Sequence, residues 1–418
     1  MLALALAAFA VLALAACGSS SSSSSGSTST SSNTASSGSK QPTGSKITTF
    51  TFADVNTQGP QYKNIAETAR VWGSWTNAHG GIKGHKVNVV FCDTKGTPTD
   101  AAACARKAVA DKAVAVVGSF NFTGDAYVPI LSKANVALFG NCCPVSPLEF
   151  TSPDSFPMGN QPLYAVGLIK RAKQDGCKKT NAVIIQGAES FIPIMKTASK
   201  KAGLPISKFI SLPATARDYS PQVAEATGGG ADCIVMIVGE TPYIAWMNAF
   251  DQSGSHARMY GPQGNLDSKV VKGHEASTNG DVISGMYPDL ALPQWKNFRA
   301  ALAQYHADPA QDYNSLGGMG TWAAYEGFKQ IVESMSGPIN NQTFLKAATT
   351  AKINLPGMVP PEDFTKTWIK DGGPKGYDRL VHRCAVFSQV KDGKIVPLTN
   401  KFEDLSLLAG GTKPANCG

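Results

Sequence analysis

The residues best suited to bind a ligand follow a buried apolar segment at positions 114–118. This segment reads Val-Ala-Val-Val-Gly, a pattern typical of a buried parallel strand. Ser119, Asn121 and Thr123 come next, in a stretch that should form a loop leading into a helix. In open α/β sheets, ligands bind beyond the carboxyl ends of the strands, where loop hydroxyls and free N–H groups of a helix N-terminus converge. The sequence therefore predicts a binding loop here, although a single turn of this kind is more often an ordinary strand-to-helix connection.

The usual catalytic motifs of an exported hydrolase are missing from the sequence. None of the six histidines lies beside a Gly-x-Ser-x-Gly nucleophile motif, and the chain has no His-Glu-x-x-His sequence. Gly118-Ser119 lacks the second glycine of the nucleophile motif. We therefore expect a binding protein that is not an enzyme and needs no cofactor, with an exported hydrolase as the least favoured alternative.

The N-terminus carries features of export and lipid attachment. Residues 2–16 are almost wholly apolar, yet this run is too short to cross a bilayer as a permanent helix, which favours an export signal. The run ends Leu-Ala-Ala-Cys17-Gly, which resembles the lipobox of bacterial lipoproteins, where the cysteine thiol is acylated before cleavage. Residues 1–17 are thus predicted to be signal peptide and lipobox. Residues 18–45, nearly all Ser, Thr and Gly, are predicted to be a flexible tether. This places the protein on the outer face of a bacterial cytoplasmic membrane, held only by its lipid.

The cysteine count fits an extracytoplasmic location. Removing Cys17 from nine cysteines leaves eight, an even number in an exported chain, so disulfides are expected. Cys92 and Cys104 form the best candidate pair, because one ends a predicted strand and the other lies in the helix that follows. Weaker candidates are Cys177 with Cys233 and Cys384 with Cys417, while the adjacent Cys142 and Cys143 are free, joined to each other in a strained ring, or paired elsewhere. No Cys-x-x-Cys or His pair has the spacing of zinc ligands, so no metal is expected.

Length and composition set the scale of the fold. A chain of 418 residues exceeds one average core, so two domains are expected. Its 43% hydrophobic and 16% charged residues fit a globular body. The formal charge of +8 is not gathered into a basic run, which argues against a nucleic-acid partner.

An alternation of strands and helices must position the binding loop. Strands are predicted at 46–53, 87–92, 114–118 and 136–139, and the pattern restarts after a Pro-rich passage with strands at 182–186, 206–212, 233–238 and 259–264. Regular β-α order implies parallel sheets covered by helices on both faces, joined by right-handed connections. The expected fold class is therefore α/β, with two Rossmann-like lobes.

The two lobes should be joined by three hinge crossings, near Asn160, Tyr287 and Val359. The first lobe would comprise residues 46–160 and 287–359, and the second lobe residues 161–286 and 360–418. Three crossings allow a bending motion while restricting twist, which is the construction expected of a closing cleft.

Several segments together resemble the type I solute-binding proteins of branched-chain amino acid ABC importers, the group that includes the Leu/Ile/Val-binding proteins. The resemblance runs from about residue 46 to beyond 394. It is carried by residues 69–84, the turn at Asp93, residues 116–119, residues 213–220, Gly261-Pro262 and the strand 384–390 with its Asp392-Gly393 turn. It implies a type I periplasmic binding protein fold, with two lobes that close on a small ligand.

The resemblance also implies binding positions. The family holds a ligand carboxylate with main-chain N–H and hydroxyl groups after its third and fourth strands, and in its second lobe offers an aromatic side chain and groups on a later loop. The corresponding residues here are Ser119, Phe120, Asn121, Gly140, Asn141 and Cys142 in the first lobe, and Phe191, Glu240 and Tyr243 in the second. Phe122 and Tyr127 could add to an aromatic wall.

One position departs from the family pattern. Where members that bind amino acids place an acid after Gly-Pro to meet the ligand ammonium, this chain has Gln263. A neutral amide pairs weakly with an ammonium, because charge-assisted hydrogen bonds are about twice as strong as neutral ones. Either Glu240 takes that role or the ligand lacks a cationic amine.

The expected function is that of a monomeric, lipid-anchored substrate-binding subunit of an ABC importer. It would capture a small polar solute, such as an amino acid or a related amide or carboxylate, and deliver it to a membrane permease. Ligand contacts from both lobes would bias an open–closed equilibrium toward the closed form. The alternative is a sensor that presents its closed form to a receptor or kinase.

Overall fold

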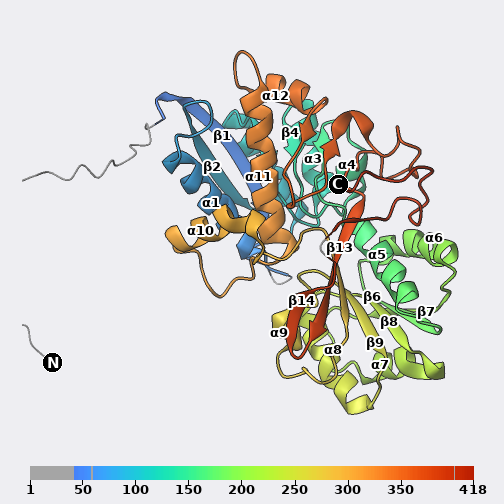
Figure 1. Cartoon of the computed structure of the whole chain (residues 1–418). Coiled ribbons are helices and arrows are strands. Elements are labelled where there is room, and N and C mark those ends of the chain that lie inside the picture. Colours follow the sequence, from blue (N-terminus) through green and yellow to red (C-terminus); the bar gives the residue numbers. More distant parts are fainter. Residues whose placement is uncertain (1–41, 58–59, 400) are drawn as a thin grey trace, which may run out of the picture. The chain divides into compact units, whose positions relative to one another are not determined.

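Residues 42–57, 60–399 and 401–418 are described by a computed structural model (Figure 1). Cys17 and the predicted signal peptide lie outside these residues. The predicted tether lies largely outside them too, although its last residues, Gly44 and Ser45, already belong to the first strand. None of the helices in the described part of the chain combines the length and the apolar character needed to span a membrane.

The first sheet has five parallel strands in the order β2-β1-β3-β4-β5. They are β1 (Gly44–Ala53), β2 (His85–Asp93), β3 (Ala115–Val117), β4 (Ala137–Phe139) and β5 (Ser155–Phe156). The helices that follow or cover them are α1 (Lys63–Ala78), α2 (Pro98–Ala110), α3 (Gly124–Lys133), α4 (Pro147–Thr151), α10 (Lys296–Gln304), α11 (Leu316–Ser334) and α12 (Asn341–Ala348). The first four strand predictions are thus confirmed to within a few residues.

Helices cover both faces of this sheet because its strand residues alternate between two apolar cores. Ala115 and Val117 pack with α1, α10, α11 and α12, whereas Val116 packs with α2 and α3 on the other face. On the α11 face, the hydroxyl groups of Thr49 and Thr51 lie 3.3 and 2.7 Å from the Tyr325 hydroxyl. The two buried threonines of β1 are therefore paired inside the core.

The second sheet is mixed and has the strand order β14-β13-β10-β9-β8-β6-β7. Its parallel strands are β6 (Thr180–Ile185), β7 (Ile206–Leu212), β8 (Cys233–Ile237), β9 (Arg258–Pro262) and β10 (Val282–Gly285), and its antiparallel strands are β13 (Cys384–Lys391) and β14 (Lys394–Pro397), with β15 (Glu403–Asp404) paired to β13. Helices α5 (Gln161–Gln174) and α6 (Ile192–Ala202) cover one face, and α7 (Ser220–Thr227), α8 (Glu240–Ser253) and α9 (Ser268–Val271) the other. The α/β fold class is confirmed.

Short elements complete the chain. Single 3₁₀ turns occur at Glu189–Phe191, Gly228–Gly230, Pro293–Trp295 and Phe364–Lys366. A separate antiparallel pair joins β11 (Lys352–Ile353) to β12 (Glu362–Asp363). The hairpin between β13 and β14 turns at Asp392 and Gly393. Their φ angles of 49° and 73° are both positive, as a two-residue type I′ hairpin turn requires.

The chain passes between the two sheets at three places, and side-chain hydrogen bonds link the first of these crossings to the third. The His382 ring Nδ1 lies 2.9 Å from the Met158 carbonyl oxygen, and the Asn160 side-chain amide donates to the Cys384 carbonyl at 2.8 Å. Burial lowers the pKa of His382 to about 4, so this histidine is neutral near pH 7.

The lobe limits proposed from the sequence remain a prediction. Phe364 packs in the core of the first sheet, whereas Trp368 and Leu380 pack in a core of the second. Since β12 also pairs with β11, these positions favour a third crossing later than Val359.

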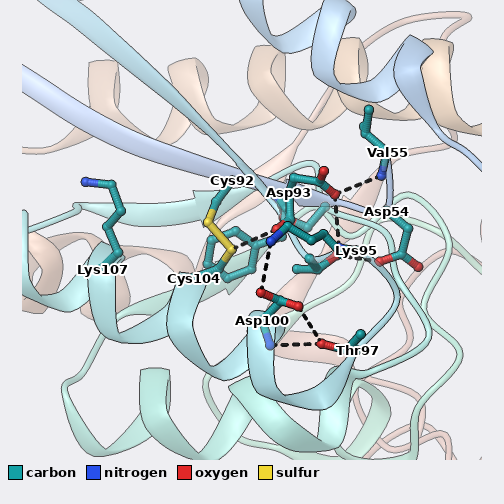
Figure 2. The surroundings of a disulfide bond; sticks show 12 residues. Asp54, Val55, Cys92, Asp93, Lys95, Thr97, Asp100, Cys104 and Lys107 are labelled. Carbon is teal, nitrogen blue, oxygen red and sulfur yellow. Dashed lines mark hydrogen bonds and ion pairs between the residues drawn. A yellow bond between two sulfur atoms is a disulfide. The ribbon is translucent and has the colours of Figure 1, made fainter. Parts of the chain in front are cut away.

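All three predicted disulfides are present. Cys92–Cys104 joins β2 to α2, as Figure 2 shows, Cys177–Cys233 joins the turn between α5 and β6 to β8, and Cys384–Cys417 joins β13 to the C-terminal segment. Their Cα atoms are 5.8, 5.9 and 5.9 Å apart, within the usual range. Cys142 and Cys143 are free and buried.

Candidate functional site

Backbone hydrogen bonds bring the loops after β1, β3 and β4 together. Phe120 N–H donates to the Phe52 carbonyl at 3.0 Å, and Gly118 N–H donates to the Phe139 carbonyl at 3.0 Å. The carboxyl ends of these three strands therefore lie side by side. The predicted first-lobe residues, from Ser119 to Phe122 and from Gly140 to Cys142, share this edge of the sheet.

The loop after β1 is held by an acidic residue, Asp93, at the end of β2 (Figure 2). Asp93 accepts the N–H groups of Val55 and Asn56, both at 3.0 Å, and that of Lys95 at 2.9 Å. These hydrogen bonds lower the Asp93 pKa despite the opposing effect of its partial burial. The charged carboxylate thus fixes the start of the loop that leads to Tyr62.

Ser119 has a role inside the sheet. Its side chain is fully buried, and its hydroxyl oxygen accepts the N–H of Phe52 at 2.9 Å. The hydroxyl hydrogen stays available for one further acceptor. Ser119 therefore ties β1 to β3 at the point where both strands end.

Two buried amides at this edge have unused hydrogen-bonding capacity. Asn121 Oδ1 accepts the N–H and the hydroxyl of Thr123 at 2.9 and 2.8 Å, while its Nδ2 is buried without a partner. Asn141 Nδ2 donates to Glu149 at 2.6 Å, while its Oδ1 is buried without a partner. Buried polar groups are rarely left unpaired, so these two atoms mark a place where a polar ligand group or water would be stabilised.

Glu149 organises the loop after β4, and the sequence analysis did not identify it. Its buried carboxylate accepts hydrogen bonds from four groups: the Tyr127 hydroxyl at 2.6 Å, the Asn141 amide at 2.6 Å, and the N–H groups of Val145 and Ser146 at 2.8 and 2.9 Å. Burial raises the Glu149 pKa, and these donors oppose that effect. The Ser146-x-x-Glu149 spacing is a capping box at the start of α4, a signal that could have revealed this residue.

Three aromatic side chains gather at the same strand ends, and we call Tyr62, Phe120 and Phe122 the aromatic cluster. The ring centroids of Tyr62 and Phe120 are 4.5 Å apart, and those of Phe120 and Phe122 are 5.2 Å apart. Phe120 is buried, but Phe122 is 55% exposed. Tyr62 was not among the predicted residues, while the predicted Tyr127 instead bonds to Glu149 in the core.

Tyr164, which packs in a core of the second sheet, lies near Cys143 of the loop after β4. Tyr164, on α5, stacks on Phe191 with ring centroids 5.5 Å apart. Burial raises the pKa of Tyr62, and both Cys143 and Tyr164 are close enough to add to this electrostatically. The structure therefore brings the predicted Phe191 near the first-lobe residues through Tyr164.

Gly140 and Cys142 pack tightly against α11. Gly140 has a φ of 68°, and a Cβ atom there would lie 2.4 Å from Cβ of Ala324. Only glycine satisfies both requirements. Cys142 is fully buried, and its Cβ atom lies against Gly320 of the same helix.

The other predicted second-lobe residues have their partners elsewhere. Glu240 forms an ion pair with Lys269 at 3.1 Å, and Tyr243 is a buried core residue next to Gly261. Gln263 Nε2 donates to the Tyr287 carbonyl at 2.9 Å, and its Oε1 accepts the Met286 N–H at 3.1 Å. Both ends of the Gln263 amide are thus occupied at the second crossing between the sheets.

A buried acid near Gln263 was also missed. Asp267 caps α9 by accepting the N–H groups of Lys269 and Val270 at 2.9 and 3.1 Å, and its Oδ2 is buried without a partner. Burial, helped by the carboxylates of Glu240 and Asp312, raises the Asp267 pKa to about 7. Asp267 therefore titrates near neutral pH in the folded protein.

One set of potential metal ligands occurs among the described residues, formed by Cys177, Asp232 and Cys233. Both sulfur atoms are bonded to each other, so neither is available as a thiolate. Asp232 accepts the N–H of Lys178 and of Lys179. This arrangement is a disulfide with a bonded carboxylate beside it.

The sequence matches one family model over most of its length. Residues 57–394 match the family described as "Periplasmic binding protein". No curated protein matches the chain significantly.

Several solved structures share the fold. A fatty acid ABC transporter substrate-binding protein from Thermomonospora curvata is 16% identical, with a TM-score of 0.71, and the match covers 90% of this chain and 97% of that one. A leucine-binding protein from Thermotoga maritima is 15% identical, with a TM-score of 0.66 and coverages of 85% and 97%. An ABC transporter solute-binding protein from R. palustris, in complex with 4-hydroxybenzoate, is 17% identical, with a TM-score of 0.68 and coverages of 84% and 95%. At these identities the likeness shows the fold.

Proposed function

Because the chain belongs to the periplasmic binding protein family, we propose that it captures a small solute at the carboxyl ends of β1, β3 and β4 and delivers it to the permease of an ABC importer. The proposed ligand contacts are the aromatic cluster together with Asn121 and Asn141. The ordinary role of such a protein requires binding and release without covalent chemistry.

The observation that carries this proposal is an exposed aromatic ring next to unsatisfied polar atoms. Phe122 is 55% exposed at the edge of the aromatic cluster, although phenylalanine is costly to leave in water. Asn121, its neighbour in the chain, has a buried Nδ2 without a partner. Binding sites combine an apolar surface with a few placed polar groups, and this edge of the sheet has both.

These groups suit a solute that has an apolar or aromatic part and a carboxylate or amide. The Asn121 Nδ2 can donate to a ligand oxygen, and the aromatic cluster can cover an apolar part. The solved relatives include proteins named for leucine, for fatty acids and for a complex with 4-hydroxybenzoate. All three of those compounds join a carboxylate to an apolar group, so we propose a ligand of that general class.

We further propose that the protein is anchored outside the cell by a lipid on Cys17. The support is the lipobox-like Leu-Ala-Ala-Cys-Gly sequence at positions 14–18 and the Ser-rich stretch after it. Cys17→Ala should release the protein from the membrane without changing its ligand affinity. Fractionation of cells that express each form measures the release.

The experiment that tests the proposed ligand class is a thermal-shift screen. Bound ligand raises the melting temperature, because it stabilises only the folded state. Amino acids, aromatic acids, short fatty acids, amides and urea would be compared at equal concentration. We expect carboxylates with an apolar part to raise the melting temperature most. A response confined to urea would reject the proposed class.

The position of the site is tested with a pair of exposed apolar residues. For a ligand found in the screen, Phe122→Ala should weaken binding by about tenfold or more, because a ring contact of roughly 1.4 kcal/mol is lost. Ile369 is a matched control, since it is 41% exposed and its neighbour Trp368 packs in a core of the second sheet. Ile369→Ala should leave the affinity unchanged. Equal affinities of both variants, measured by calorimetry, would reject the aromatic cluster as the site.

A further inference from the structure

Cys142 and Cys143 differ from the other cysteines of the described chain in their pairing. Six cysteines form three disulfides, and these two are free, 0% and 3% exposed, and adjacent in the sequence. No other free cysteine occurs among residues 42–57, 60–399 and 401–418. Within this part of the chain, each of the two can therefore form a disulfide only with the other or by displacing an existing pair.

The surroundings of the two thiols connect them to the candidate site and to two of the crossings. A Cβ atom on Gly159 would lie 1.7 Å from the Cys142 carbonyl oxygen, and one on Gly320 would lie 2.5 Å from Cys142 Cβ and 2.9 Å from the Tyr287 hydroxyl. The first crossing, α11 and the second crossing thus all approach Cys142. Cys143 lies near Tyr62 and Tyr164, whose pKa values it helps to raise.

The geometry points to a redox site: we propose that Cys142 and Cys143 form a reversible vicinal disulfide that opens under milder reduction than the three long-range disulfides. The proposal concerns the covalent state of two residues, so it does not depend on which solute the protein binds. It requires an oxidant of the thiol–disulfide exchange class, such as a glutathione disulfide or an oxidoreductase disulfide.

The exchange balances in two steps. One cysteine thiolate attacks the oxidant disulfide, whose S–S bond breaks and releases one oxidant thiolate, leaving a mixed disulfide. The second cysteine thiolate then attacks the protein sulfur of that mixed disulfide and displaces the other oxidant thiolate. The pair loses two electrons, the oxidant gains two, and the two protons of the cysteines pass to the released thiolates.

The difference in lability follows from chain geometry. Residues joined by a trans peptide have Cα atoms about 3.8 Å apart, below the usual disulfide range of roughly 4.4–6.8 Å. The three existing disulfides span 5.8 to 5.9 Å and lie within it. A ring closed between neighbours is strained, and strained disulfides are reduced more easily.

Burial sets the conditions under which the pair reacts. It raises the pKa of the Cys143 thiol, which keeps that group protonated and unreactive at neutral pH in the folded protein. An oxidant would then reach the pair while the chain folds, or when the loop after β4 opens. The test therefore needs one arm that starts from the folded protein and one that starts from the unfolded chain.

The test uses the full-length protein in a series of glutathione and glutathione disulfide buffers. One arm starts from folded protein, and the other refolds fully reduced chain in each buffer. Free thiols are then trapped by acid and alkylated, and peptide mass spectrometry reports the state of each cysteine. We expect the Cys142–Cys143 bond to form and to open at a reductant-to-oxidant ratio at least tenfold lower than that needed to open the other three, about 30 mV for a two-electron couple.

A variant distinguishes a bond between Cys142 and Cys143 from a mixed disulfide with glutathione. Cys142→Ser leaves Cys143 without its neighbour, so in the refolding arm it should carry glutathione instead of an internal bond. The proposal is overturned if both cysteines of the unaltered chain stay alkylated at the most oxidising ratio in both arms. It is also overturned if their bond opens only together with the three long-range disulfides.

Discussion

The Ser119 hydroxyl accepts the backbone N–H of Phe52 at 2.9 Å, across the ends of β3 and β1. Ser119 was predicted as a ligand contact, and this bond gives it a role in holding the loops of the site in place. Ser119→Ala should lower the free energy of unfolding by about 1 kcal/mol, because a buried donor loses its acceptor. Urea unfolding measures the change.

The control for this substitution is a serine on the surface of the second sheet. Ser211 lies exposed in β7, so Ser211→Ala should change stability by less than about 0.5 kcal/mol. If the two variants were equally stable, the Ser119 bond would have no structural role. The ligand affinity of the folded Ser119→Ala protein then tests separately whether the Ser119 hydroxyl hydrogen is donated to the ligand.

The folded protein should require the Glu149 carboxylate, because both of its oxygens accept hydrogen bonds. Gln has one acceptor oxygen and a donor NH₂, so Glu149→Gln cannot satisfy the four donors that now point at the carboxylate. We expect a loss of about 2–3 kcal/mol in unfolding free energy, because at least one buried donor is left facing another donor. Urea unfolding at pH 7 tests this.

An exposed glutamate provides the comparison for Glu149. Glu225 forms only a long surface ion pair with Lys208, at 3.7 Å. Glu225→Gln should therefore cost no more than about 0.5 kcal/mol. A loss in Glu149→Gln as small as this would mean that the buried network tolerates an extra donor.

The strands and helices could be predicted because they leave regular signals in the sequence. Apolar runs such as 114–118 ended at glycines, and Asp392-Gly393 marked the hairpin between β13 and β14. The Cys92–Cys104 pair was predicted because one cysteine ends a strand and the other lies in the helix that follows, whereas the other two pairs were weaker candidates without such an argument. Segment 352–383 gave no such signal, since its strands have only two residues each.

The side-chain partners of the candidate site were not predictable in the same way. Tyr164 and Glu149 meet Phe191 and Tyr127, which lie 27 and 22 residues away in the sequence. Periodicity identifies the buried face of an element, but it does not specify which distant side chain completes a hydrogen-bond network. The occupied amide of Gln263 is a similar case, because its partners belong to a crossing whose path depends on both sheets.

Asp267 should make stability fall as pH rises toward neutrality. Its pKa is about 7 in the folded protein and 3.8 as the reference for the unfolded chain, so between these values the folded state binds more protons. The unfolding free energy contributed by Asp267 therefore declines from pH 4 to pH 7 and stays low above it. Asp267→Asn removes this decline but keeps the cap on α9, since asparagine is an equally good cap. At pH 8 the variant should be more stable than the unaltered protein by on the order of 2 kcal/mol.

Asp218 offers a control, because its pKa is shifted in the opposite direction to that of Asp267. The hydrogen bonds from the Ser220 hydroxyl and N–H lower the Asp218 pKa, so this exposed group contributes stability above the unfolded pKa and loses it as pH falls. Asp218→Asn should therefore remove a contribution present at pH 8. Thermal unfolding from about pH 2 to pH 8 compares the two variants, and equal pH profiles would contradict the assignment of the near-neutral titration to Asp267.

Gly320 should be required for the close approach of α11 to Cys142 and Tyr287. A Cβ atom at this position would lie 2.5 Å from Cys142 Cβ and 2.9 Å from the Tyr287 hydroxyl. Because the helix backbone and the loop after β4 must then separate, Gly320→Ala should cost about 1–3 kcal/mol, despite the better helix propensity of alanine. Thermal or urea unfolding measures the loss.

A second glycine of the same helix separates packing from propensity. At Gly327 the nearest atom to an added Cβ is the Met158 sulfur at 3.1 Å, and a flexible methionine side chain can move away. Gly327→Ala should therefore be close to neutral. Tyr287→Phe removes the hydroxyl that the new methyl would meet, so the Gly320→Ala loss should shrink when both changes are combined. Equal losses of unfolding free energy at Gly320 and Gly327 would show that contact with Cys142 and Tyr287 is not the reason why position 320 requires glycine.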